Sequence, residues 1–139
     1  MKHFFLDTNI LLDFLIDRKP FADQAALLFQ AAADSKVKLY VAAISFNNIY
    51  YIVRQVHAHA KTIGLLKTLA EYVEIVAIDG VILNKAIASD FKDFEDGIQG
   101  FAAESVAAIE LIVTRNIKDF KKSNLPVFSP ESAAELLNL

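Results

Sequence analysis

The sequence has no cysteine, no surplus of positive charge and no long apolar run, and each absence excludes a class of protein. Without cysteine there is no disulfide framework and no cysteine-based metal site, which fits a reducing cytoplasm. The net charge of -3 at pH 7 argues against binding nucleic acid by bulk electrostatics, although it leaves a local basic patch open. No apolar run approaches the roughly 18 residues of a membrane span, so we expect a soluble, cytoplasmic protein that does not associate with membranes.

The composition that is present is typical of a compact globular chain. Hydrophobic residues make up 55% of the 139 positions and charged residues 22%. This length suits one domain with a sizeable core. Because the chain contains no internal repeat, linker or low-complexity segment, we expect a single domain over residues 1–139.

Short apolar segments alternate with segments of helical periodicity along the whole chain. Strands are expected at residues 4–6, 38–42, 73–78 and 111–113, with a weak fifth strand at 126–128. Helices are expected at residues 8–17, 21–34, 45–54, 60–71, 80–89 and 94–106, and after Ser129. Strands separated by helices indicate a three-layer α/β/α fold with a central parallel sheet of four or five strands.

Asp7 stands where the first expected strand ends and the first expected helix begins. In an open α/β sheet, ligands bind outside the carboxyl ends of the strands, so Asp7 is a candidate for chemistry. The competing interpretation is a helix N-cap, because Asp, Thr and Asn all cap well. Capping residues are also expected at Ser45 and Asp79, each at the start of a later helix.

Further acids occur at two places that a doubly wound strand order would bring close to Asp7. Asp93, Glu95 and Asp96 cluster at a helix start, and residues 114–119 follow the fourth strand. Carboxylates that converge raise each other's pKa unless a cation neutralises them. Oxygen-only ligands favour a hard ion such as Mg²⁺ or Mn²⁺. The positive end of the helix macrodipole would explain one or two of these acids without a metal.

Gly97 and Gly100 lie one turn apart just after these acids. Each glycine costs about 1 kcal/mol inside a helix relative to alanine. Two such costs indicate a close backbone approach, either by another helix or by a substrate.

Three motifs in this order resemble those of a known family. They are Asp7-Thr8-Asn9 at the end of the first strand, Asp93-Phe94-Glu95-Asp96 opening a late helix, and Thr114-Arg115-Asn116 with Asp119-Phe120 after the fourth strand. Together they look like the PIN-domain ribonucleases, in the branch that contains the VapC-type toxins. The resemblance covers essentially the whole chain and implies a PIN-like fold. It also implies an Mg²⁺- or Mn²⁺-dependent endoribonuclease that hydrolyses RNA phosphodiester bonds, and it indicates the toxin of a toxin–antitoxin pair.

The resemblance also implies roles for particular residues. Asp7, Asp96 and Asp119 would bind the metal, and Asn116 would join these three acids as a catalytic residue. Supporting roles fall to Asn9, Asn48, Asp93 and Thr114.

Asn48 departs from the family pattern, which usually carries an acid at this position of the helix after the second strand. Asparagine can offer a carbonyl or bind a metal-bound water, but it brings no charge. A second interpretation therefore stays open, a PIN-like module that binds RNA or protein and has weakened catalysis. A third is a receiver-type signalling domain, which also gathers acids around Mg²⁺ but would have a lysine where this chain has residues 114–116.

The densest basic run lies beside the expected site. Arg115, Lys118, Lys121 and Lys122 could hold the phosphates that flank a scissile bond, or they could form a solvated loop face.

The helices at 45–54 and 60–71 carry more apolar surface than one sheet face should absorb. We therefore expect a homodimer formed through these helices, and the family resemblance points the same way. A cognate antitoxin protein is the other expected partner, in addition to RNA.

Overall fold

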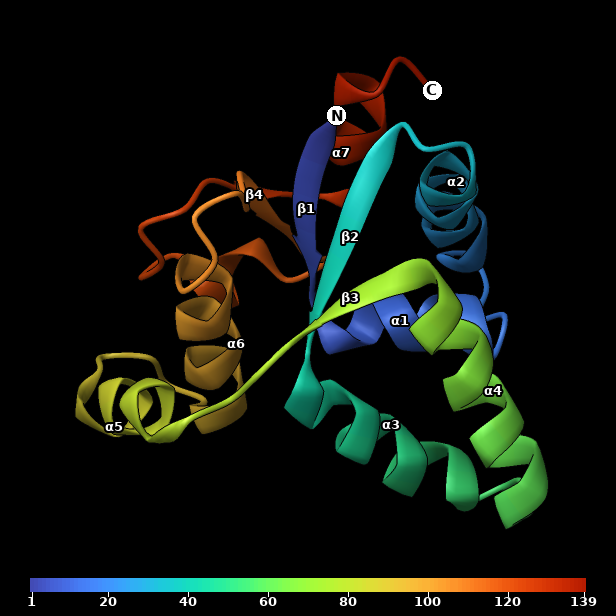
Figure 1. Ribbon diagram of the computed structural model, residues 1–139, viewed down its shortest axis with the longest axis horizontal. Coiled ribbons are helices and arrows are strands. Elements are labelled where there is room, and N and C mark those ends of the chain that lie inside the picture. Colours follow the sequence, from blue (N-terminus) through green and yellow to red (C-terminus); the bar gives the residue numbers. More distant parts are fainter.

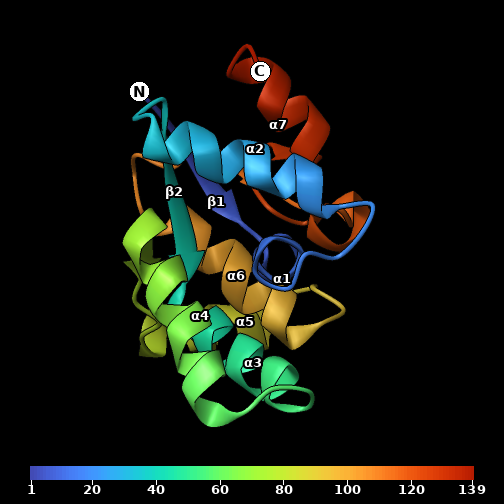
Figure 2. The ribbon, with the colours of Figure 1, turned by 90° about the vertical axis from the view of Figure 1, so that its right-hand side faces the viewer.

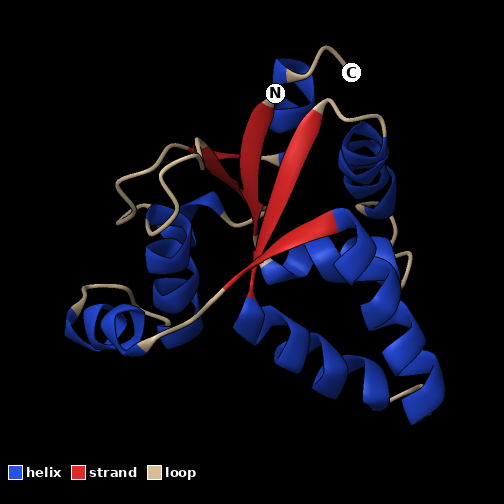
Figure 3. Ribbon diagram, in the orientation of Figure 1, coloured by secondary structure: helices blue, strands red, loops and turns tan.

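Five parallel strands form one sheet in the order β3-β2-β1-β4-β5 in the computed structural model, which describes residues 1–139. The strands are β1 (Lys2–Leu6), β2 (Val37–Ala42), β3 (Val73–Val76), β4 (Leu111–Val113) and β5 (Val127–Phe128). Each was expected from the sequence, and the parallel sheet of five strands confirms the predicted fold class (Figure 3).

The helices that connect the strands cover both faces of the sheet (Figure 1). They are α1 (Thr8–Leu15), α2 (Ala22–Ala33), α3 (Ala43–Arg54), α4 (His59–Tyr72), α5 (Gly80–Ala88), α6 (Phe94–Glu104) and α7 (Pro130–Leu136), with a short 3₁₀ helix η1 (Ile117–Phe120). No helix is both long and apolar enough to cross a membrane.

The central strands are buried on both faces, as a continuous apolar run predicts for a parallel sheet. On β1, Phe4 and Leu6 pack into a core with α1, α2, α3, α4 and α7, whereas Phe5 packs into a second core with α5 and α6. All three side chains are fully buried. The alternation follows from the two-residue period of a strand, and it produces the three layers seen in Figure 1.

The strand order brings the carboxyl ends of β1, β2 and β4 together. β1 lies between β2 and β4, with Leu6 opposite Val113. The predicted neighbourhood of the first and fourth strands is therefore confirmed. This order also differs from the 2-1-3-4-5 order of receiver-type domains, so the receiver interpretation is wrong.

The two ends of the sheet have different surroundings. Both chain termini lie at the amino end of β1, near α7, whereas α3 and α4 extend from the opposite end (Figures 1 and 2). The helix-opening segments at the carboxyl ends of β1 and β2 thus meet on the side away from the termini.

The prediction that Asp79 caps a helix is confirmed, and the prediction that Ser45 caps one is wrong. The Asp79 carboxylate accepts a hydrogen bond from the Ile82 N–H at 2.9 Å. Helix α3 begins at Ala43, immediately after β2 ends at Ala42, so Ser45 lies inside the first turn and is buried. Its hydroxyl is free to contact another element.

The space beside the two glycines of α6 is filled by protein side chains and does not leave room for a substrate. A Cβ atom added at Gly100 would lie 2.9 Å from Cζ of Phe91. At Gly97 the nearest atoms are the Cβ atoms of Phe91, at 3.4 Å, and Ala86 of α5, at 3.5 Å. The two glycines thus allow Phe91 and α5 to pack against α6.

Candidate active site

Asp7 is the buried centre of the site. It leaves β1 while its N–H still pairs with the carbonyl of Val113, at 3.0 Å, and its side chain makes no helix-capping bond. Instead Oδ1 accepts a hydrogen bond from Nε2 of Gln99 at 3.2 Å, and Oδ2 accepts one from Oγ1 of Thr114 at 2.8 Å. Burial raises the pKa of Asp7, and these two hydrogen bonds partly oppose that rise. Helix capping therefore does not explain this carboxylate.

Thr8 links Asp7 to the neighbouring helices. Its N–H donates to Oε1 of Gln99 at 3.2 Å, and its hydroxyl lies 2.7 Å from the hydroxyl of Ser45 on α3. The same hydroxyl can donate to Oε1 of Glu95 on α6 at 3.3 Å. Residues from α1, α3 and α6 thus form one polar network beside Asp7.

Glu95 of α6 lies beside Asn48 of α3. Burial raises the pKa of the half-buried Glu95 carboxyl, the hydrogen bonds from Asn48 and Thr8 oppose the rise, and the charges of Asp7 and Asp93 add to it. Asn48 therefore contributes to the site as a hydrogen-bond partner of a carboxylate. The charge beside it comes from α6.

Asp96 interacts with every other acid of the cluster. Its pKa is raised to about 7, first by burial and then by the charges of Asp93, Asp7, Asp119 and Glu95, in that order. Asp93 also caps α6, because its carboxylate accepts from the N–H of Asp96 at 3.0 Å. The macrodipole interpretation therefore accounts for Asp93 but not for the convergence of the others.

The segment after β4 contributes Thr114 and Asp119. Thr114 is fully buried, and its hydroxyl accepts from the N–H of Asn116 at 3.0 Å while it donates to Asp7. Asp119 is an exposed residue of η1 whose charge reaches both Asp7 and Asp96. The side chain of Asn116 is exposed.

Arg115 and Asn9 belong to a separate ion-pair cluster. The Arg115 guanidinium donates to the fully buried carboxylate of Asp13, with Nε 2.7 Å from Oδ2, and it lies 3.8 Å above the ring of Phe21. Arg18 donates to the same carboxylate at 2.9 Å and to Oδ1 of Asn9 at 3.3 Å. Arg115 is thus paired and stacked, unlike the lysines that follow it.

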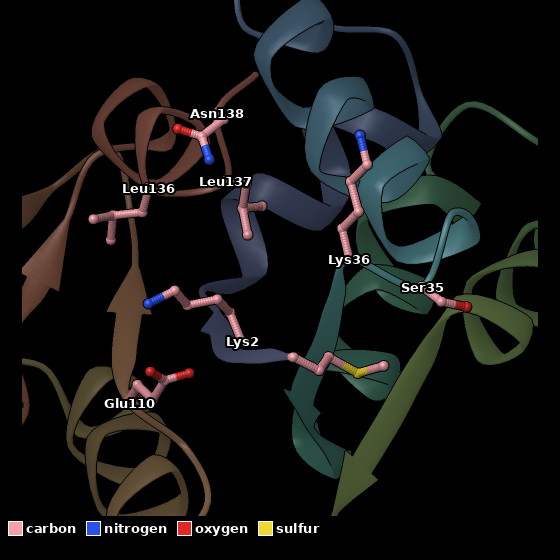
Figure 4. Close-up of a pocket in the computed structure, with 8 residues that line it drawn as sticks. Lys2, Ser35, Lys36, Glu110, Leu136, Leu137 and Asn138 are labelled. Atoms are coloured by element: carbon pink, nitrogen blue, oxygen red, sulfur yellow. The ribbon is translucent and has the colours of Figure 1, made fainter.

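A pocket of about 290 Å³ lies beside Asp96 and has walls of opposite charge. It is lined by Asp90, Phe91, Lys92, Asp93, Asp96, Lys118, Asp119, Lys121 and Lys122. A different pocket, of about 510 Å³, opens at the amino end of β1 around Lys2, Lys36 and Glu110 (Figure 4). Only one acid, Glu110, lines that second pocket, whereas acids of the cluster and the three lysines of the basic run both line the pocket beside Asp96.

The donor set has the chemistry of a hard-cation site. Asp7, Glu95, Asp96 and Asp119 offer only oxygen ligands, and their mutual repulsion is the condition that a divalent ion relieves. In the conformation described, no three acidic or histidine side chains are close enough to hold one ion together.

Gln99 was not predicted from the sequence, Ser45 was predicted only as a helix cap, and Glu95 was predicted only as one of the converging acids. Gln99, Ser45 and Glu95 contact Asp7 or Thr8 from α6 and α3. Gln99 is three residues after Asp96 and four after Glu95, so helical periodicity placed it on the same face as both acids. That spacing was the available signal.

The sequence matches the model of the PIN domain over residues 3–118. The chain belongs to the PIN domain family. This confirms the resemblance inferred from the three motifs. No curated protein matched the sequence.

Solved structures that resemble this PIN domain include VapBC proteins and a VapC toxin, all at low sequence identity. The DNA-bound VapBC of Salmonella typhimurium has a TM-score of 0.69 and 16% identity, covering 94% of this chain and 99% of that one. VapBC-1 of nontypeable Haemophilus influenzae has a TM-score of 0.65 and 16% identity, covering 93% and 98%. Mycobacterium tuberculosis VapC20, described as a toxin that cleaves the sarcin-ricin loop, has a TM-score of 0.59 and 12% identity, covering 78% and 86%. At these identities the likeness establishes a shared fold.

Proposed function

We propose that this PIN-domain protein is an endoribonuclease that hydrolyses RNA phosphodiester bonds with Mg²⁺ or Mn²⁺. The observation that carries the proposal is the convergence of Asp96 with four other carboxylates at the carboxyl edge of the sheet, where burial and their charges raise the pKa of Asp96. Such perturbed acids at the end of parallel strands are typical of functional sites. One solved structure with this fold is described as a toxin that cleaves the sarcin-ricin loop, which supports RNA as the substrate.

Asp7, Asp96 and Asp119 would move together to hold the ion, because no three acids are close enough in the conformation described. Glu95 would add a fourth charge beside Asn48. A bound Mg²⁺ or Mn²⁺ supplies an activated water and an electrophile for the phosphate. The protein's own contribution is to fix the carboxylates, which Thr114 does directly for Asp7. Asp93 supports Asp96 by capping α6, and Asn9 holds the turn after β1 through its bond with Arg18.

Lys118, Lys121 and Lys122 would bind the phosphates on either side of the scissile bond, because they line the same pocket as Asp96 and Asp119. The exposed Asn116 would contact the substrate from the same segment. Arg115, which is paired with Asp13, would contribute by shaping that segment.

The biological role would be that of the toxin in a toxin–antitoxin pair, acting in the cytoplasm. VapBC structures bound to DNA are among the relatives, which supports a cognate antitoxin as a partner. A homodimer through α3 and α4 completes the proposal.

Two substitutions test the nuclease assignment. Asp7→Asn and Asp96→Asn should each lower Mn²⁺-dependent cleavage of single-stranded RNA by roughly 100-fold or more, because each removes a charged ligand. Asp23→Asn, a change at an exposed acid of α2, is the matched control and should cleave normally. Circular dichroism checks that all variants are folded.

The outcomes separate the two remaining functions. A variant at Asp7 or Asp96 that cleaves at the wild-type rate means that the metal site is assigned wrongly. If the wild-type protein binds RNA but never cleaves it with Mn²⁺ or Mg²⁺, the chain is a PIN-like binding module, the role that the neutral Asn48 favours.

A further inference from the structure

Gln99 is a fully buried polar residue in contact with the central acid. Its Nε2 lies 3.2 Å from Oδ1 of Asp7, and its Oε1 lies 3.2 Å from the N–H of Thr8 and 3.4 Å from the Thr8 hydroxyl. One side chain of α6 thus satisfies two consecutive residues at the end of β1.

The chemistry of its partners fixes the orientation of the Gln99 amide. An ionised Asp7 carboxylate only accepts hydrogen bonds, and the Thr8 N–H only donates. Nε2 must therefore face Asp7 and Oε1 must face Thr8. In this arrangement every buried side-chain polar atom of the protein has a partner.

The hydrogen bonds of Gln99 and Thr114 together fix the orientation of the Asp7 carboxylate. Thr114 fixes Oδ2 from β4, and Gln99 fixes Oδ1 from α6, so the plane of the carboxylate is defined from both sides. Glu95, one turn before Gln99 on α6, reaches the same Thr8 that Gln99 holds. The orientation of Asp7 is thereby tied to the helix that carries two of the other acids.

We propose that Gln99 is a positioning residue that holds the Asp7 carboxylate in the orientation needed to bind a divalent ion. The proposal rests on the proposed metal site. Gln99 is not itself placed among the ligands.

A comparison of Gln99→Met with a matched control tests the proposal. Methionine keeps the length and burial of the side chain but cannot donate to Asp7. The control is Thr62→Val, which removes the hydrogen bond from another fully buried side chain, in α4, to the carbonyl of Ala58, the N-cap residue of that helix.

Mn²⁺ binding to the metal-free proteins is measured by calorimetry, together with thermal melting. We expect both variants to melt below the wild type. Gln99→Met should bind Mn²⁺ about tenfold or more weakly, as is usual when a residue that orients a ligand is lost, and Thr62→Val should bind it normally. Wild-type Mn²⁺ affinity in Gln99→Met would overturn the positioning role and leave Gln99 a structural residue.

A double-variant cycle without metal separates this proposal from the proposed function. Gln99→Met, Asp7→Ala and the double variant are melted in the presence of a chelator. If the two side chains interact, the combined loss in Tm is smaller than the sum of the single losses. Additive losses overturn the Gln99–Asp7 interaction even if the wild type binds Mn²⁺. A wild type that binds no Mn²⁺ overturns the metal site instead, and the cycle still decides whether Gln99 holds Asp7.

Discussion

Asp96 is a carboxylic acid whose pKa lies near physiological pH. Its ordinary pKa of 3.8 rises to about 7 because it is partly buried and because four carboxylates surround it. The pKa values of Asp7 and Glu95 are raised as well, with burial again the largest cause. In the metal-free protein all three ionisations therefore oppose folding.

A pH dependence of stability follows from these directions. Between about pH 4 and about pH 7, Asp96 keeps its proton in the folded state, whereas the unfolded chain has released it. The free energy of unfolding of the metal-free protein should therefore fall as the pH rises through this window. Urea titrations at several pH values, with a chelator present, measure the slope.

Asp96→Asn should make that slope shallower, and the exposed control Asp23→Asn should leave it unchanged. An equal slope in wild type and Asp96→Asn would show that Asp96 does not ionise late.

The acids of the site could be predicted from the sequence because strand ends are readable. Asp7 and Thr114 each follow a buried apolar run, and parallel strands place such positions on one edge. Helical spacing placed Gln99 on the face of the acids, but neither its role nor that of Ser45 could be predicted, because neutral residues acquire a role only through the packing of α6 and α3 against the end of β1. The pairing of Arg115 with Asp13, 102 residues earlier, is likewise a tertiary contact.

At the scale of elements, most boundaries of helices and strands could be predicted from periodicity. The start of α3 could not, because β2 passes into it without a loop. A Ser before an apolar helical pattern normally signals a cap, but here the chain is already helical two residues earlier. The general position of the third helix was still sufficient to bring Asn48 to the site.

The glycines of α6 and α4 should respond differently to alanine. A Cβ at Gly100 would meet Phe91 at 2.9 Å, and that ring also packs edge-on against Phe101. Gly100→Ala should destabilise the protein by about 1–3 kcal/mol, the usual cost of overpacking, in spite of the better helix propensity. Urea unfolding at one pH measures the change.

Gly64→Ala in α4 is the control, because nothing lies within 4 Å of its Cβ position. This change should stabilise the protein by about 0.5–1 kcal/mol. If Gly100→Ala proves as stabilising as Gly64→Ala, the ring of Phe91 does not rest on α6.

At the scale of the whole molecule, the hairpin of α3 and α4 leaves apolar side chains in solvent. Ile49, Val53 and Leu69 are buried in the core, whereas Tyr51 is 65% and Val56 76% exposed. The core thus absorbs one side of α3 and α4. The exposed Tyr51 and Ile52 of α3 and Val56 in the loop after it form the contact that we propose for a second copy of the chain.

Sedimentation velocity at micromolar concentration should therefore detect a dimer. Val56→Glu should weaken self-association about tenfold or more, because it buries a charge in the contact. Val81→Glu on α5, where the side chain is 62% exposed, is the control and should remain dimeric. A wild-type monomer, or equal effects of the two variants, would remove the proposed contact.

The position of β1 between β2 and β4 has a consequence for protein synthesis. Asp7 leaves the ribosome before Thr114, its hydrogen-bond partner directly after β4, which is 107 residues later in the chain. A nascent chain that ends before β4 carries Asp7 on a strand with one open edge, without the hydroxyl that orients the carboxylate and without Asp119. The complete acid cluster therefore forms only once β4 and η1 have been translated. The nuclease that we propose would therefore gain its activity only after these elements have been made, and an RNA would not be cleaved by a growing chain that stops before β4.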